Sequence, residues 1–179
     1  MKPFFSTAPT LETERLRLRA FRLDDFASFD AVFQDPEESR FLGGMIPTGE
    51  SWRKFVFNTG HWALMGYGWW IVADKATDKY VGLVGFADFK RDMEPRLPDG
   101  TPEMGWAFLS RYHGKGFATE SAKCAMAWHD QTLKFPCVAA VIDAGNAPSR
   151  KIAAKLGFRE VGESILRGKP ILRFERRLF

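Results

Sequence analysis

The chain has 179 residues, of which 45% are hydrophobic, and it carries a formal net charge of +4. This length suits one domain with its own core. No apolar run approaches the ~20 residues of a transmembrane helix, and charges follow the N-terminus too closely for a secretion signal. Two cysteines are too few for a disulfide scaffold or a zinc cluster. We therefore expect a cytoplasmic protein with one domain over residues 1–179, of which 1–10 form a loose N-terminal segment.

The positive charge is scattered along the chain. The 26 Lys and Arg residues lie among 22 acids and do not form a block. This pattern weighs against a nucleic-acid-binding surface, although the charge alone keeps that class of protein as a hypothesis. A modest positive field is equally suited to a polyanionic small molecule.

The first half of the chain predicts alternating helices and strands. Residues 15–21 alternate Leu and Arg as a half-buried strand, and Asp24 is placed as the N-cap of a helix that ends before Pro36. Residues 36–49 are expected to be irregular. The remaining predictions are a helix at 51–64, strands at 69–74 and 80–89, and a long loop at 90–102.

The stretch 103–134 predicts a strand, a glycine-containing turn and a helix. Residues 103–109 alternate large side chains with Gly105 and Ala107, so one strand face is nearly bare. Glycine inside a strand indicates close approach of a ligand or of another packed element, and both remain open. The helix that follows, at 116–134, is amphipathic.

The turn before that helix has the properties of an anion site. Residues 111–116 offer no Ser, Thr, Asp or Asn as an N-cap, and they contain two glycines and the cations Arg111 and Lys115. Free N–H groups at a helix N-terminus suit a pyrophosphate. The alternative is that glycine caps the helix and water satisfies the remaining donors. The spacing fits neither a Walker A loop nor a complete dinucleotide fingerprint.

The last third predicts a strand at 137–142, a helix at 149–156 capped by Ser149 and ended at Gly157, and a hairpin of strands 158–165 and 171–178. Together these elements predict an α+β domain. Its central sheet is mixed but mostly antiparallel, is flanked by helices, and has one parallel crossover through the 116–134 helix.

Three motifs resemble one enzyme family. The residues RYHGKG at 111–116 are similar to the acetyl-coenzyme A motif of the GCN5-related N-acetyltransferases (GNAT). LETERLRLR at 11–19 and NAPS at 146–149, continuing to KLGF at 155–158, resemble that family's RimJ/RimL-like branch, which acetylates ribosomal proteins. The resemblance implies splayed central strands and a metal-free transfer of acetyl from acetyl-coenzyme A (acetyl-CoA) to a primary amine, by direct attack in a ternary complex.

The resemblance also implies where the coenzyme binds. Backbone N–H groups of the turn would take the pyrophosphate and backbone groups of residues 107–109 the pantetheine arm, with which the bare strand face is consistent. Asn146 and Ser149 would lie beside the arm, although a loop position and an N-cap explain them equally. The expected coenzyme-binding residues are Ala107, Phe108, Leu109, Arg111, Tyr112, His113, Gly114, Lys115, Gly116, Phe117, Ala118, Asn146 and Ser149.

An amine acceptor needs a base, because it is protonated at neutral pH. Glu103 stands where related enzymes carry a catalytic glutamate, although it would also fit a solvated strand-end carboxylate; His113 is the second choice. The family's usual general acid, a tyrosine, is replaced by Ala153, so Ser149, Tyr112 or water would have to protonate the leaving thiolate.

That replacement also raises an alternative, a catalytically impaired module that binds acyl-CoA. The expected partners are acetyl-CoA and an unidentified amine, a protein N-terminus or a small molecule, with neither nucleic acid nor membrane. The protein would be a monomer or a homodimer.

Overall fold

A computed structural model describes residues 5–178. Within them, nine strands form one sheet in the order β1-β2-β3-β4-β6-β7-β9-β8-β5. The strands are β1 (Leu11–Glu12), β2 (Leu16–Arg19), β3 (Trp69–Asp74), β4 (Tyr80–Ala87), β5 (Met93–Glu94), β6 (Glu103–Phe108), β7 (Cys137–Ile142), β8 (Arg159–Leu166) and β9 (Lys169–Arg177). The helices are α1 (Phe26–Gln34), α2 (Pro36–Ser39), α3 (Thr48–Met65), α4 (Phe117–Trp128) and α5 (Ala147–Lys155).

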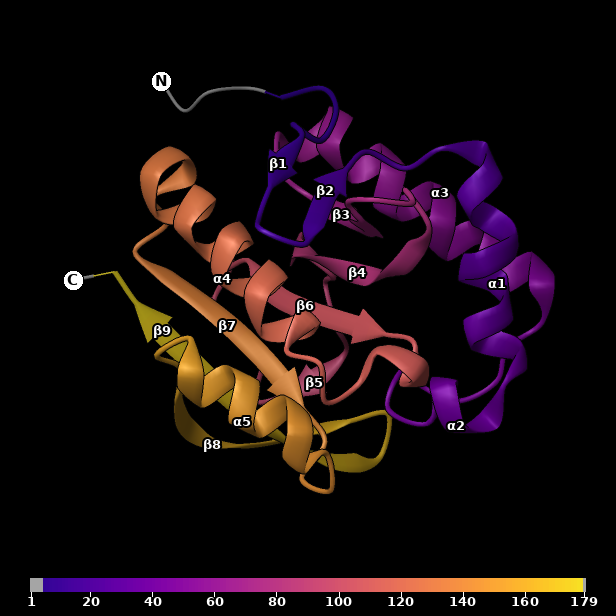
Figure 1. Ribbon diagram of the computed structural model, residues 1–179. Helices are drawn as coiled ribbons and strands as arrows, with labels where there is room; N and C mark the ends of the chain where they lie inside the picture. The colour runs from indigo at the N-terminus through magenta and orange to yellow at the C-terminus, as the bar shows by residue number, and fades with distance from the viewer. Residues whose placement is uncertain (1–4, 179) are drawn as a thin grey trace.

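The sheet is antiparallel except between β6 and β7, which run parallel because α4 connects them (Figure 1). This confirms the predicted mixed sheet with one crossover. Only one residue pair, Glu103 and Ala139, joins the two strands in register. Beyond that pair β6 and β7 separate, which confirms the expected splay at the centre of the sheet.

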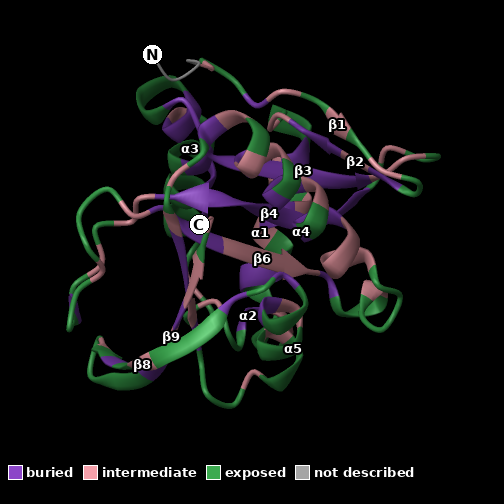
Figure 2. Cartoon of the chain, turned by 90° about the vertical axis from the view of Figure 1, so that its left-hand side faces the viewer, coloured by how far each residue is buried: buried purple, intermediate pink, exposed green. Residues whose placement is uncertain are grey.

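Helices cover both faces of the sheet. Strand β3 shows why, since Trp70 and Val72 pack into the core beneath α4, whereas Trp69 and Ile71 pack against residues of α1 and α3. Side chains alternate across a strand, so one apolar strand supplies both cores. In Figure 1, α4 and α5 lie in front of the sheet, and Figure 2 shows β3 and β4 buried while much of the β8–β9 hairpin is exposed.

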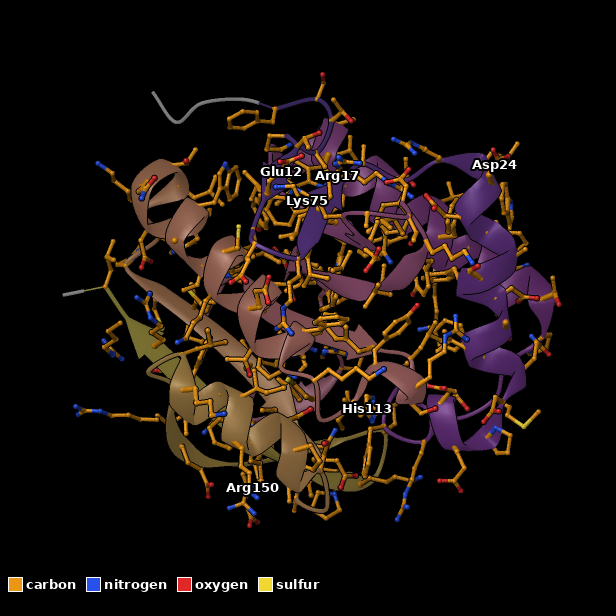
Figure 3. The ribbon with its side chains drawn as sticks, in the orientation of Figure 1. Glu12, Arg17, Asp24, Lys75, His113 and Arg150 are labelled. Atoms are coloured by element: carbon orange, nitrogen blue, oxygen red, sulfur yellow. The ribbon has the colours of Figure 1, made fainter. Side chains whose placement is uncertain are left out.

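Several predicted helix ends need correction. Asp25, not Asp24, directly precedes α1, and its carboxylate accepts the backbone N–H of Arg22 at 2.8 Å; Asp24 points outward (Figure 3). Asn146, not Ser149, caps α5, because its Oδ1 accepts the N–H of Ser149 at 3.1 Å. No side chain caps α1, so its start carries no capping signal, whereas Asn146 and Ser149 are both good capping residues and the sequence does not show which of them caps α5.

Other segments are more ordered than predicted. The region 36–49 contains α2 and the start of α3, and the loop 90–102 contains β5, which pairs with β8. Residues 1–4 of the segment expected to be loose lie outside the described residues, but Ala8 is buried and the indole N–H of Trp70 donates to Pro9 O at 2.7 Å. Helix α4 ends at Trp128. The chain continues in a π-helical turn, His129–Leu133, in which His129 and Leu133 are buried.

Candidate functional site

The site begins where β6 and β7 separate. The N–H of Ala139 donates to Pro102 O at 3.0 Å, which closes the near end of the gap. Residues 105–108 of β6 are then half-buried (Figure 2). Leu109 donates its N–H to Val81 on β4, and because strand residues alternate in direction, the backbone groups of Trp106 and Phe108 face the gap.

Two neighbours of this gap are already engaged. His113 donates its Nε2–H to Phe108 O at 2.8 Å, which fixes the ring beside the gap (Figure 3). In the neutral ring with its hydrogen on Nε2, Nδ1 is the nitrogen that can accept a proton. Leu109 uses its N–H on Val81, and its carbonyl accepts the N–H of Tyr112 at 2.9 Å. Leu109, predicted as a backbone contact for the pantetheine arm, therefore has both backbone groups in use.

The turn between β6 and α4 presents a row of free donors. Gly114 and Gly116 have φ of 72° and 81°, the left-handed region that favours glycine, and no side chain caps α4. The N–H groups of Tyr112 and His113, which we expected to face an anion, donate instead to Leu109 O and Ser110 O. Among residues 5–178 the N–H groups of 114–118 have no hydrogen-bond acceptor, so they are the donors of the turn that remain available to an anion.

Acidic groups on both sides shape this turn. Glu38 accepts the N–H of Ser110 with both carboxylate oxygens, at 2.9 and 3.0 Å, so α2 is tied to the start of the turn. The expected cations Arg111 and Lys115 both lie over the Tyr112 ring, with Cζ and Nζ 5.2 and 5.6 Å from its centroid. Arg111 also lines a surface cleft of about 450 Å³ with Arg19 and Tyr80.

A further cation, Arg15, was missed by the sequence analysis as a site residue. Its Nη1 donates to Lys115 O at 3.0 Å, its Nε donates to Glu120 at 2.8 Å, and its guanidinium lies 4.5 Å from the Phe117 ring centroid. No local pattern reveals this contact, because Arg15 and Glu120 are 105 residues apart. Glu120, near the start of α4, links this helix to the residues that precede β2.

Glu120 is held as a carboxylate by these contacts. Burial on its own raises the pKa of Glu120, but hydrogen bonds from Thr13, at 2.6 Å, and from Arg15 outweigh it and lower the pKa below its ordinary value. The positive Arg15 is thereby fixed against the turn, where it adds to the field of the helix N-terminus.

Glu103, the expected base, lies at the closed end of the gap. It is buried, and both of its oxygens accept hydrogen bonds from Arg91, each at 2.7 Å. The interpretation of Glu103 as a solvated carboxylate is therefore wrong. The pair is a bidentate ion pair, the geometry that gives a strong charge-assisted contact.

The structure decides between the two explanations left open for the bare strand face. A Cβ on Gly105 would lie 2.6 Å from Cη2 of Trp69, so the tryptophan ring occupies the space left by the missing side chain. Of the two explanations left open, close packing of another element holds at Gly105. The opening beside β6 comes from strand separation.

Two residues of α5 and its N-cap take different positions relative to the gap. Ser149 Oγ accepts the indole N–H of Trp106 at 3.2 Å, which links α5 to β6 across the separated strands. Asn146 caps the helix at the same end. Ala153 is fully buried in the core and presents no polar group to the gap.

Other catalytic chemistries find little support in the described residues. Burial raises the pKa of the Cys124 and Cys137 thiols, and Glu120 and Glu175 raise them further, so neither is activated as a nucleophile. Residues 5–178 contain no cluster of His, Cys, Asp and Glu able to hold a metal ion. None of their helices has the length and apolar character needed to cross a bilayer.

Known proteins resemble this chain over most of its length. A family model described as an acetyltransferase (GNAT) domain matches residues 15–159. The Bacillus subtilis protein YkkB is 28% identical over 170 residues, covering 94% of this chain and 96% of its own length.

Solved structures show the same fold. An acetyltransferase from Agrobacterium tumefaciens superposes with a TM-score of 0.83 at 24% identity, covering 99% of each chain. A ribosomal-protein-S5-alanine acetyltransferase from Vibrio fischeri superposes with a TM-score of 0.72 at 20% identity, covering 95% of this chain and 97% of its own.

Proposed function

Because the chain belongs to the GNAT acetyltransferase family, we propose that it transfers acetyl from acetyl-CoA to a primary amine by direct attack in a ternary complex. The observation that carries the proposal is the row of free N–H groups at 114–118, at the open end of the gap between β6 and β7. A row of donors at a helix N-terminus fits a pyrophosphate, and a gap between strands fits an extended arm.

The residues present fit the coenzyme in a specific way. The N–H groups of 114–118, with Arg15 beside them, would hold the pyrophosphate. The backbone groups of Trp106 and the N–H of Phe108, whose carbonyl already accepts from His113, would bind the arm in place of Ala107 and Leu109. Asn146 would contact the arm with the amide nitrogen left free by capping. Acetyl-CoA supplies the thioester carbonyl that the amine attacks.

Two side chains are suited to move protons. We assign Glu103 as the general base that takes the proton of the attacking amine, once Arg91 yields one of its oxygens. We assign Ser149 as the general acid, because its oxygen accepts from Trp106 and its own hydrogen is therefore free to be donated into the gap. His113, through Nδ1, is the second candidate for the base.

The acceptor is a free protein N-terminus, as in the RimJ/RimL-like branch, or a small amine. We propose that the enzyme is cytoplasmic, works without metal, nucleic acid or membrane, and is a monomer or a homodimer. The second candidate function is a catalytically impaired acyl-CoA-binding module. It is favoured by the buried Ala153, where the family's tyrosine is missing, and by the neutralisation of Glu103 by Arg91.

Thermal unfolding with and without acetyl-CoA tests the proposal. At a concentration 100 times its dissociation constant, a ligand of the native state adds about 2.7 kcal/mol to the free energy of unfolding. Gly114 has a positive φ and no atom within 4 Å of an added Cβ, so Asp and Asn both fit there at similar strain. Gly114→Asp should abolish the stabilisation by charge repulsion, and the isosteric Gly114→Asn should retain most of it.

Release of free thiol in the presence of amines then separates the two functions. An active enzyme produces thiol and acetylated amine in equal amounts, whereas the impaired module is stabilised by acetyl-CoA without either product. No stabilisation of the wild-type protein, or equal losses in the two Gly114 variants, would refute the placement of the coenzyme on this turn.

A further inference from the structure

The carboxylate of Glu38 joins helix α2 to the start of the turn between β6 and α4. Both of its oxygens accept the backbone N–H of Ser110, at 2.9 and 3.0 Å. The two residues are 72 apart in the sequence, and α2 lies beside the end of β6 in Figure 1. The proposed function places the pyrophosphate on N–H groups a few residues further along, at 114–118. The contact therefore bears on how that row of donors is held.

Helix α2 offers a fixed point for this contact. Asp35 caps the helix, because its Oδ1 accepts the N–H groups of Glu37 and Glu38 at 2.8 and 3.1 Å. Ser39 is fully buried and donates its hydroxyl hydrogen to Asp35 O at 2.7 Å. The N–H of Leu42 in turn donates to Ser39 O at 2.8 Å. The Glu38 side chain thus extends from a helix that is hydrogen-bonded at both ends.

Hydrogen bonds lead from Ser110 to the row of free donors. The carbonyl of Ser110 accepts the N–H of His113 at 2.9 Å, and the carbonyl of Leu109 accepts the N–H of Tyr112 at the same distance. His113 directly precedes Gly114, the first residue of the row. The contact that orients the N–H of Ser110 therefore also orients the single helical turn from which the row begins.

Apolar packing is the other contact between the α2 side and this turn. Leu42 and Ile46 pack against the cluster that contains Leu109. Within residues 5–178, no hydrogen bond other than that of Glu38 joins residues 26–47 to residues 103–118. Apolar packing is non-directional, whereas a hydrogen bond depends steeply on the direction of the N–H. Glu38 is thus the group on this side that sets the orientation of the Ser110 peptide.

The charge of Glu38 and its geometry have opposite effects on a bound anion. A carboxylate near the turn repels a pyrophosphate, but Glu38 is half-exposed, so solvent and salt screen that repulsion. An acceptor for the Ser110 N–H, in contrast, keeps the turn in the conformation that presents its donors. Pre-organised donors bind more tightly, because less conformational freedom is lost on binding. Glutamine separates the two effects, since it keeps an acceptor oxygen without the charge.

We propose, on the basis of the proposed function, that Glu38 is a positioning residue for acetyl-CoA. Its carboxylate holds Ser110, and the bond from His113 to Ser110 O holds the donors at 114–118 in the arrangement that binds the pyrophosphate. Glu38 acts through Ser110 and not by contact with the coenzyme or the amine. Its loss therefore weakens coenzyme binding and leaves the chemical step unchanged.

Titration calorimetry with acetyl-CoA compares three α2 variants. Glu38→Ala removes the acceptor and should raise the dissociation constant about tenfold, the effect of one charge-assisted hydrogen bond. Glu38→Gln keeps an acceptor and should bind within about threefold of the wild type. Glu37→Ala is the matched control, because it removes a carboxylate from the adjacent position, and within residues 5–178 that carboxylate has no hydrogen bond or ion pair. It should bind as the wild type does.

A double-mutant cycle shows whether Glu38 acts through Ser110. Ser110→Pro removes the N–H at the first residue of the 3-10 turn, a position that suits proline. Leu109 before it has φ of −57° and ψ of 138°, an extended conformation compatible with a following proline. In the Ser110→Pro protein, Glu38→Ala should change the dissociation constant by less than about twofold.

Steady-state kinetics distinguish positioning from a structural role. In Glu38→Ala the KM for acetyl-CoA should rise about tenfold while kcat stays within about twofold of the wild type, and Glu38→Gln should restore most of the KM. A structural role alone would lower the stability of the ligand-free protein and reduce kcat with the folded fraction, and KM would not change.

The alternative outcomes are distinct. Wild-type affinity in Glu38→Ala, equal losses in Glu38→Gln and Glu38→Ala, or a full effect of Glu38→Ala in the Ser110→Pro protein would overturn the inference and leave the acetyltransferase assignment intact. The same holds if Glu38→Ala does not fold, because the contact would then serve the fold. Failure of acetyl-CoA to bind the wild-type protein would remove the proposed function itself.

Discussion

The indole of Trp106 on β6 donates a hydrogen bond to the hydroxyl of Ser149 on α5, at 3.2 Å, across the gap that opens between β6 and β7. At this point β6 is not paired with β7, because the two strands pair only at Glu103 and Ala139. The bond therefore holds the gap at a defined width while leaving the strand backbone free. It also determines which way the Ser149 hydroxyl hydrogen can point.

Ser149→Ala should lower kcat about 100-fold, the lower range for loss of a proton donor, with little change in the stabilisation by acetyl-CoA. Trp106→Phe keeps the hydroxyl but loses the bond that orients it, so a smaller loss of kcat is expected. Steady-state kinetics with a saturating acceptor measure both. A Ser149→Ala enzyme with unchanged kcat would remove Ser149 as the general acid and leave it as a structural contact of Trp106.

Gly105→Ala should destabilise the protein by about 1–3 kcal/mol, because the added methyl group would be 2.6 Å from the Trp69 ring in a packed core. The matched control is Gly60→Ala in α3, where no atom lies within 4 Å of the added Cβ and helix propensity predicts a gain of about 0.5–1 kcal/mol. Denaturant unfolding measures both free energies.

Combining Gly105→Ala with Trp69→Phe should recover part of the loss, because the smaller ring leaves room for the methyl group. An unchanged stability in the single Gly105→Ala variant would mean that β6 can move away from β3 at this point. The tight contact would then not be what selects glycine.

The limits of sequence prediction follow from the distance over which each interaction acts. The strands at 69–74 and 137–142 match β3 and β7 to the residue, because an apolar run with turns on each side is a local signal. The glycine conformations and the uncapped start of α4 were also predictable from local sequence, since two glycines stand together in a stretch without capping residues. The Gly105 contact could only be narrowed to two alternatives, because the filling side chain comes from β3.

Contacts between side chains that are far apart in the sequence could not be predicted. Arg91 and Glu103 are 12 residues apart with an irregular segment between them, and Arg15 and Glu120 are 105 apart. Charge patterns do not specify a partner when the backbone path between two residues is unknown. The burial of Glu103 and the role of Arg15 therefore had to come from the three-dimensional structure.

Glu120→Gln should destabilise the protein by about 1–2 kcal/mol at pH 7, because the hydrogen bonds from Thr13 and Arg15 then go to a neutral group. The effect depends on pH in a defined direction. The pKa of Glu120 is lowered in the folded protein, so its contribution is present above its ordinary value of 4.5 and is lost as pH falls through the folded-state pKa.

Unfolding free energies between pH 3 and pH 8 should therefore show wild type and Glu120→Gln converging at the acid end. Glu14→Gln, an exposed carboxamide substitution next to Arg15, is the control and should follow the wild-type curve. A constant difference between Glu120→Gln and wild type at all pH values would show that the ionised carboxylate is not what holds β2 to α4.

A second pH effect is expected at His61 of α3, which accepts a hydrogen bond from Asp88, the first residue after β4. Its Nδ1–H donates to Tyr67 O at 2.6 Å and its Nε2 accepts the N–H of Asp88, so the bound form is the neutral ring. Burial lowers the pKa of His61, although the Tyr67 carbonyl and the charge of Asp88 oppose this. A lowered histidine pKa means that its stabilising contribution is present above the ordinary value of 6.5 and is lost as pH falls below it.

Amide hydrogen exchange measures this effect directly, because protonated Nε2 can no longer accept the Asp88 N–H. Once exchange rates are corrected for their intrinsic pH dependence, protection of the Asp88 amide in the wild-type protein should fall as the pH is lowered below 6.5 and through the folded-state pKa of His61. His113→Gln, which removes the exposed histidine of the turn, should show the same fall, whereas His61→Leu, which has no acceptor for the Asp88 N–H, should show low protection throughout. Protection in the wild type that does not change as the pH is lowered would mean that the Asp88 N–H is shielded by the fold of the segment after β4 and not by its bond to the neutral imidazole.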